Sequence, residues 1–146
     1  MKRVITKILE KNKDVLDSVS DNEITDFEND NGIYLPKDYA ELLKTFDGGE
    51  ILIPGPIIFG VKENNLRKTI KEINGKSFRK NFSIPSNYLI FGKLNYGDFV
   101  CINLNNPHDI IQWNHETDQL FCSWESLKDW LKDNLSSFEE FEEENK

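Results

Sequence analysis

Apolar residues in the first third of the chain recur at helical spacing. Residues 3–18 place their apolar side chains on one face of a helix, which predicts an amphipathic helix over that range. Ser20 is followed three residues later by Glu23, the pattern of a capping box in which each side chain bonds the other's backbone amide. We therefore expect a second, short helix that ends at Gly32, because glycine tolerates the left-handed backbone that closes helices.

A third helix is predicted to open at Leu35-Pro36, because proline suits the first helical position, where its missing N–H would have no partner. Its apolar residues fall at positions i, i+3, i+4 and i+7 and form one core-facing stripe: Tyr39, Leu42, Leu43 and Phe46. The segment 47–49 contains two glycines and is expected to end the helix.

Short apolar segments separated by turn residues follow, a pattern typical of antiparallel strands. They cover residues 50–53, 57–59, 88–91, 99–104, 110–113 and 119–122. Between the second and third of them, residues 62–74 are expected to be helical, with a narrow apolar stripe of Leu66, Ile70 and Ile73, and residues 75–83 to form a loop. A final helix, capped by Ser123, keeps helical spacing from Trp124 to Leu135.

This order of elements predicts an α+β domain with N-terminal helices, a central antiparallel sheet of about five or six strands, and a C-terminal helix packed against it. With 146 residues, of which 38% are apolar and 12% aromatic, the chain can close one core by itself. We expect a single domain over residues 1–138, followed by an acidic C-terminal tail over residues 139–146.

The charge is distributed unevenly around a formal net value of −8. Residues 139–146 carry five acids and one base, whereas residues 62–80 carry seven bases and two acids. An acidic field disfavours nucleic acid and favours basic protein partners. The tail is either a partner-binding segment or a frayed, solubilising terminus. Only Phe78 and Phe82 accompany the basic segment, so a solvated surface is favoured there over a nucleic-acid patch.

No segment has the length of a signal-peptide core or of a bilayer-spanning helix, so we expect a cytoplasmic protein that does not bind membranes. Cys101 and Cys122 lie in apolar, strand-like segments and are expected to be buried, reduced thiols. Together with His108 and His115 they lack the paired spacing of a zinc site. We expect neither a metal nor a cofactor.

Motifs that support catalysis are missing from the sequence: there is no Walker lysine, dinucleotide fingerprint or nucleophile elbow. His115 beside Glu116 and Asp118 is the one group that resembles an acid–base cluster, but such residues in a turn between strands more often serve the hairpin. A cysteine paired with His115 is conceivable without local support. We expect a protein that is not an enzyme.

A family resemblance rests on motifs in a fixed order. Residues 32–49 combine Leu35-Pro36, a tyrosine three residues later, an apolar helix and a glycine pair before the first strand. Gly97-Asp98 precedes a later strand, and Trp113 with His115-Glu116 marks the next. Over residues 20–135 this pattern resembles the SUKH superfamily, which includes fungal regulators of cell-wall synthesis and many bacterial immunity proteins.

The resemblance implies an α+β fold in which the matching residues are structural: Leu35, Pro36, Tyr39, Gly48, Gly49, Gly97 and Trp113. It also implies function by association, because many bacterial members bind and block a toxin delivered by neighbouring cells, often a nuclease. The Asn-, Lys- and Ile-rich composition favours the bacterial role. We therefore expect an immunity protein whose partner is a cognate toxin. A nuclease domain with a basic surface is the expected class of toxin.

Exposed acids near turns at the sheet edge, the acidic tail and aromatic anchors are the expected contacts to that partner. These candidates are Asp47, Glu50, Tyr96, Asp98, Glu116, Asp118, Glu139, Glu140 and Phe141. Two alternatives stay open: a regulatory protein-binding module without a toxin, and a small hydrolase that uses His115. A homodimer formed through a free sheet edge also stays open.

Overall fold

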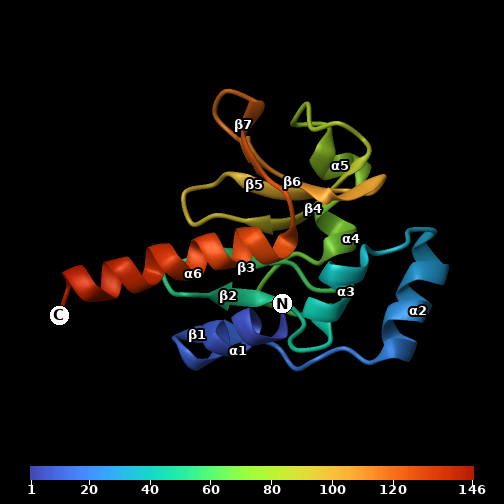
Figure 1. Cartoon of the computed structure of the whole chain (residues 1–146). Helices are drawn as coiled ribbons and strands as arrows, with labels where there is room; N and C mark the ends of the chain where they lie inside the picture. Colours follow the sequence, from blue (N-terminus) through green and yellow to red (C-terminus); the bar gives the residue numbers. More distant parts are fainter.

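A seven-stranded antiparallel sheet runs through the computed structural model, which describes residues 1–146 (Figure 1). Its strands are β1 (Lys13–Val15), β2 (Gly49–Ile51), β3 (Ile57–Ile58), β4 (Tyr88–Lys93), β5 (Phe99–Asn103), β6 (Asn106–Asn114) and β7 (Gln119–Trp124). They lie side by side in chain order, so β1 and β7 form the two edges. The predicted α+β class is confirmed, with slightly more strands than expected.

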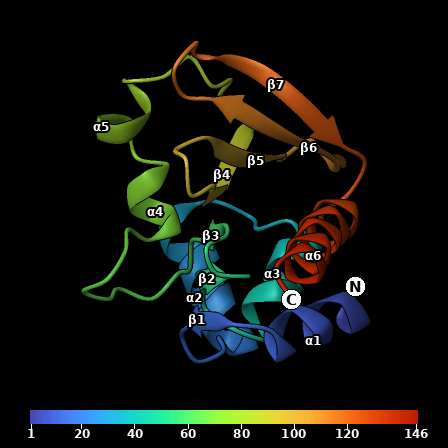
Figure 2. The ribbon, with the colours of Figure 1, turned by 90° about the vertical axis from the view of Figure 1, so that its left-hand side faces the viewer.

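Helices cover both faces of this sheet. They are α1 (Lys2–Glu10), α2 (Asp21–Asn31), α3 (Lys37–Leu43), α4 (Ile70–Ile73), α5 (Lys76–Arg79) and α6 (Leu127–Glu144). Figure 2 shows α1, α3 and α6 on one side of the sheet and α4 and α5 on the other. None of the helices combines the length and the apolar character that crossing a bilayer requires.

An aromatic stack joins the layers of the core. The ring of Trp130 in α6 meets Phe91 in β4 edge-on, with centroids 5.4 Å apart and an interplanar angle of 85°. The ring of Phe91 in turn packs against that of Tyr39 in α3, with centroids 5.8 Å apart. The Tyr39 hydroxyl donates to the carbonyl oxygen of Phe59, just after β3. These side chains thus tie α3 and α6, which are far apart in the sequence, to the middle of the sheet.

The predicted start of the fold is partly confirmed. The capping box of Ser20 and Glu23 is present, and α2 ends at Gly32 in the left-handed conformation. Pro36 is the cap of α3, one residue before its first helical position. The prediction of a helix over residues 3–18 is wrong beyond Glu10. There the chain turns and adds β1 to the free edge of β2. Tertiary pairing overrides the helical spacing there.

The basic segment departs further from its prediction. Of residues 62–74 only α4 is helical, and Leu66, expected in its apolar stripe, is 66% exposed. The side chain of Asn64 accepts hydrogen bonds from the backbone N–H groups of Leu66 and Arg67, which holds a turn in place of a helix. The loop expected over residues 75–83 contains the short helix α5.

The last helix begins later and extends further than expected. Its cap is Ser126, whose hydroxyl accepts the Asp129 N–H at 3.0 Å, and not Ser123. Trp124 still belongs to β7, because it pairs with Ile110 of β6. The segment expected to form a tail is helical as far as Glu144.

The approach of β1 to β2 is expected to require glycine at position 49. A Cβ on Gly49, whose φ is 136°, would lie 2.2 Å from the carbonyl oxygen of Asp14. Gly49→Ala should therefore lower the free energy of unfolding by about 3 kcal/mol or more. In the control Gly32→Ala, φ is also positive but no atom lies within 4 Å, so the loss should be about 1 kcal/mol. Equal losses in urea denaturation would contradict this account.

Candidate functional site

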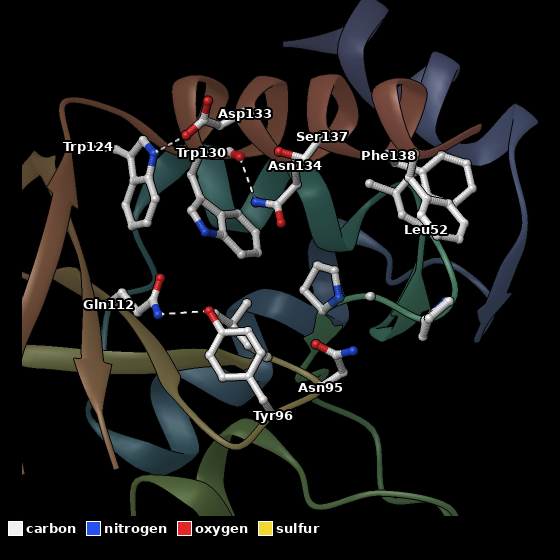
Figure 3. Close-up of a pocket in the computed structure, with 15 residues that line it drawn as sticks. Leu52, Asn95, Tyr96, Gln112, Trp124, Trp130, Asp133, Asn134, Ser137 and Phe138 are labelled. Carbon is white, nitrogen blue, oxygen red and sulfur yellow. Dashed lines mark hydrogen bonds between the residues drawn. The ribbon is translucent and has the colours of Figure 1, made fainter. Parts of the chain in front are cut away.

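A groove of about 430 Å³ lies between α6 and two turns of the sheet. One wall is α6, and the other comes from the β2–β3 turn at residues 52–56 and the β4–β5 turn at residues 94–96, with Gln112 and Trp124 at its end. In Figure 3 the side chains of Trp130, Asn134 and Phe138 point from α6 toward Tyr96 and Leu52. We refer to this feature as the α6 groove.

The groove exists because the apolar stripe of α6 ends before the helix does. Leu127, Trp130, Leu131 and Leu135 are buried, whereas later residues of the helix are half-buried or exposed. Phe138 packs only partly against the core, and Phe141 is 53% exposed. The last turns of α6 therefore hold two aromatic rings beside a surface that no other element covers.

Polar groups are placed among the aromatic side chains of the α6 groove. The indole N–H of Trp124 donates to Oδ2 of Asp133 at 2.9 Å. Asn134 donates to the carbonyl oxygen of Trp130 at 2.8 Å, and its own Oδ1 accepts no bond from the chain. An apolar lining with a few polar groups of fixed orientation is typical of a binding site.

A second, more highly charged hollow continues from the groove along α6. Phe138 and Phe141 line both, and the hollow adds three glutamates of α6 together with Lys11. Lys11 bonds Glu142 at 2.8 Å, which ties the end of α6 to the segment after α1. This hydrogen bond raises the pKa of Lys11, so the lysine stays charged.

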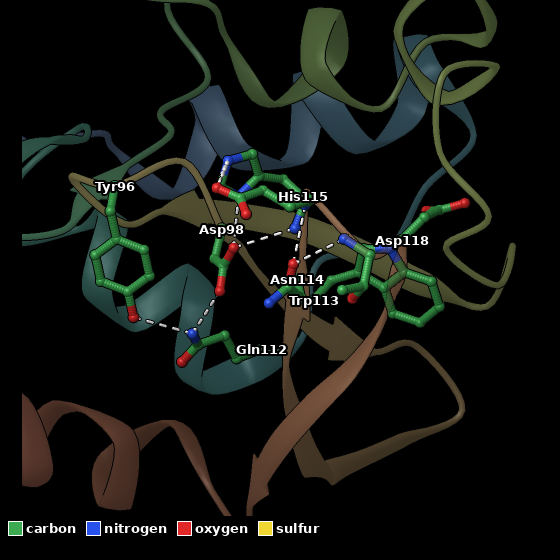
Figure 4. A network of polar contacts seen from close by, with 9 residues as sticks. Tyr96, Asp98, Gln112, Trp113, Asn114, His115 and Asp118 are labelled. Atoms are coloured by element: carbon green, nitrogen blue, oxygen red, sulfur yellow. Dashed lines mark hydrogen bonds and ion pairs between the residues drawn. The ribbon is translucent and has the colours of Figure 1, made fainter.

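A polar network lies on the sheet at the end of the β4–β5 turn (Figure 4). The carboxylate of Asp98 accepts a hydrogen bond from the side-chain amide of Gln112 at 2.8 Å. It also lies 2.6 Å from Nδ1 of His115 and accepts the backbone N–H of that residue. Gln112 also donates to the Tyr96 hydroxyl at 3.0 Å. Through Tyr96 and Gln112 the network reaches the wall of the α6 groove.

Gly97 makes room for this network. Its φ is 107°, and a Cβ there would lie 2.8 Å from the Nε2 atom of His115. The Gly97-Asp98 motif and the Trp113-to-Glu116 motif are therefore two halves of one contact between the β4–β5 and β6–β7 hairpins. Trp113 is anchored on the other side, where its indole N–H donates to Asp118 at 2.9 Å.

The expectation that Asp47 and Asp98 are exposed is wrong, because the two residues are 1% and 4% exposed. Asp47 accepts the backbone N–H groups of Val61 and Lys62. Burial raises the pKa of Asp47. Burial acts in the same direction on Asp98, but the bonds from His115 and Gln112 outweigh it and its pKa is lowered. Both carboxylates serve turns of the sheet.

The acid–base cluster expected around His115 has a different composition. Asp118 accepts the Ser83 and Trp113 N–H groups, and these bonds lower its pKa. The side chain of Glu116 is 81% exposed and stays 3.8 Å from His115. Burial raises the pKa of the Cys101 thiol to about 12, so the thiolate that a nucleophile requires is not populated near neutral pH.

The α6 groove brings together two of the residues predicted to contact a partner, Tyr96 and Phe141. Glu139 lines the adjacent hollow, and Glu140 is exposed on α6. Glu50 is half-buried and bonds the N–H of Gly55 at the foot of the groove.

Sequence reasoning did not find Trp124, Asp133 and Asn134 as groove residues. Trp124 was assigned to the helix instead of β7, which hid its contact with Asp133. No local pattern singles out Asp133 among the acids of this helix, because its role depends on which wall it faces.

Comparison with protein families gives one match. The model described as the SMI1 / KNR4 family (SUKH-1) matches residues 18–133, about four fifths of the chain. The matched region runs from just before α2 to the first turns of α6, so it includes Trp124 and Trp130 and stops before Phe138. No curated protein matches the chain.

The lowered pKa of Asp98 predicts a pH-dependent contribution to stability. A carboxyl whose pKa falls on folding stabilises the fold above its unfolded value, 3.8, and this contribution is lost as the pH falls through the folded value. Asp98→Asn should cost about 1–3 kcal/mol at neutral pH. The difference from the unchanged protein should shrink below about pH 4.

Asp47→Asn serves as the control, because the raised pKa of Asp47 gives the opposite sign. The advantage of the unchanged protein over this variant should decline as the pH rises through the folded pKa. Urea denaturation across acidic pH measures both trends. Parallel trends for the two variants would contradict the assigned roles.

Proposed function

The chain belongs to the SMI1 / KNR4 family (SUKH-1), and on that premise we propose that it is an immunity protein. It binds a toxin that neighbouring bacterial cells deliver and neutralises it in the cytoplasm. The partner is a nuclease domain with a basic groove for nucleic-acid phosphates. The observation that carries this proposal is the exposed end of α6, where acidic residues and unburied aromatic rings stand beside an open groove.

Electrostatics support a basic partner. Residues 139–146 carry five acids and one base, and α6 presents them on a rigid helix that Lys11 holds in place. A fixed array of carboxylates can occupy the positions that phosphates take on a nuclease surface. Such complementarity speeds association and selects against partners of the same sign.

We also propose that the protein acts without catalysis. The ring of His115 is 31% exposed and contacts the buried carboxylate of Asp98, a contact that joins two hairpins. No serine or cysteine hydrogen-bonds to its ring nitrogens, whose polar contacts are with Asp98 and Glu116. The histidine is thereby accounted for as part of the sheet's framework.

Coexpression tests the proposed function. The reading frame next to this gene should encode a large secreted protein with a toxin-like C-terminal domain. Producing that domain alone should arrest growth, and coexpression of this chain should restore it and yield a copurifying complex. Failure to restore growth, with both proteins produced, would refute the immunity role.

The acidic end of α6 should control the rate of association with that toxin domain. Neutralising four exposed glutamates should slow association by about tenfold at low salt; these are Glu139, Glu140, Glu143 and Glu144. The matched control neutralises four exposed acids near α2 and α3: Asp17, Asp26, Asp30 and Glu41. Stopped-flow binding at rising ionic strength should erase the difference. An equal slowing by both sets would count against α6.

His115→Ala should leave protection intact. The change removes the contact with Asp98 and is expected to cost about 1–2 kcal/mol of stability. At matched levels of folded protein, cells producing the variant should survive the toxin as well as cells producing the unchanged chain. Loss of protection by a folded His115→Ala variant would favour the hydrolase alternative.

A further inference from the structure

We propose that the α6 groove binds a segment of the partner protein in which an aromatic or aliphatic anchor side chain lies between two lysines or arginines. The inference rests on the proposed function in that the toxin supplies this segment. It adds a site and a recognition chemistry, both of which can be tested without the toxin.

The anchor is inferred from the walls of the groove. Tyr96 and Phe141 are 60% and 53% exposed, although most aromatic side chains of this protein are buried or half-buried. The volume, about 430 Å³, lies within the range of sites that enclose a ligand. An apolar side chain that entered here would cover both rings together with Phe138. Exposed rings around a pocket are typical of binding hot spots.

The basic residues are inferred from the rim. Asp133, Ser137, Glu140 and Glu144 recur at i, i+4, i+7 and i+11, so they form one stripe along α6. Asp133 and Ser137 line the groove, which makes this stripe its rim. The ion pairs at the end of α6 use Glu142 and Glu143, so the carboxylates of the rim remain available. No lysine or arginine lines the groove.

Helix geometry sets the spacing of the partner's charges. A rise of about 1.5 Å per residue separates Asp133 and Glu140 by roughly 10 Å along the axis. An extended segment spans that distance with about three residues. Side chains of an extended segment alternate between its two faces, so cations four positions apart, with the anchor midway, all point toward the groove. Their long, flexible side chains make up the small remaining difference in spacing and match both carboxylates. Oδ2 of Asp133 already accepts the Trp124 N–H, which orients Oδ1 as an acceptor for such a cation.

Charge also argues against a second copy of this chain as the occupant. The copy would bring a net charge of −8 to a rim that is itself acidic. Its segment 62–80 is basic, however, and docking of that segment is the form in which self-association would appear. The test below separates this outcome from a partner segment.

Selection from a phage-displayed library of random dodecapeptides on the purified chain tests the proposal. Enriched peptides should carry an aromatic or aliphatic residue midway between basic residues four positions apart. The double variant Tyr96→Ala/Phe141→Ala should weaken binding of the most enriched peptide by about tenfold or more. Tyr34→Ala removes an aromatic residue that is 81% exposed outside the groove and should have no effect.

A second pair of variants tests the rim with a control on the same helix. Glu140→Lys/Glu144→Lys should weaken binding of the most enriched peptide by about tenfold. Glu139→Lys/Glu143→Lys makes the same change of charge at two residues that line the adjacent hollow and not the groove, and it should weaken binding by less than about threefold. In nitrogen-15 spectra of the unchanged chain, the peptide should shift the indole signals of Trp124 and Trp130. Trp113, which lies outside the groove, should not move.

Several results would overturn the proposal. They are enrichment of acidic or uncharged peptides, no enrichment, binding unaffected by Tyr96→Ala/Phe141→Ala, equal effects of the two lysine pairs, or a shift confined to Trp113. A dimer in sedimentation that Tyr96→Ala/Phe141→Ala dissociates would assign the groove to a second copy. Rescue from the toxin by the Tyr96→Ala/Phe141→Ala variant would leave the immunity role standing and remove the groove from it. If the peptide binds the groove as expected but the unchanged chain does not rescue cells from the toxin, the groove would stand as a binding site and the immunity role would fall.

Discussion

The stack of Trp130, Phe91 and Tyr39 is the contact on which the arrangement of this molecule depends. It joins α6, β4 and α3, and the Tyr39 hydroxyl extends it to the chain after β3. Large side chains in contact at the centre of a core contribute both apolar burial and defined ring geometry. Because Trp130 lies in the first turns of α6, the stack fixes that half of the helix against the sheet.

The second half of α6 follows from the first as a rigid extension. The helix continues for more than two turns after its last fully buried residue, Leu135. It therefore carries Phe138, Phe141 and the glutamates over the turns that end β2 and β4. The family match ends at Asp133, so the framework belongs to the common domain, whereas most of the acidic surface lies beyond it. A framework that matches the family, with an acidic surface that lies mostly beyond the matched region, is what the proposed role in binding a partner requires.

The sequence predicts the elements whose signals are local and periodic. The capping box at Ser20 and the burial of the stripe from Tyr39 to Phe46 depend only on nearby residues, and both are confirmed, although α3 ends at Leu43, before Phe46. The strand β1 was missed because it forms only against β2, where Gly49 lets the backbone of Asp14 approach. The groove was missed for the same reason. Its residues come from five separate segments, and the spacing of Asp133 and Glu140 gains meaning only once the facing wall is known.

We propose above all that the partner is bound by α6 and the turns facing it. Hydrogen–deuterium exchange of the chain, alone and in complex with the proposed toxin domain, tests this claim most directly. Slowed exchange is expected at residues 94–97 and along the exposed end of α6, with α2 and the outer edge of β7 unchanged. Slowed exchange confined to residues 119–123 of β7 or to α2 would contradict the account, because a surface away from the groove would then hold the partner.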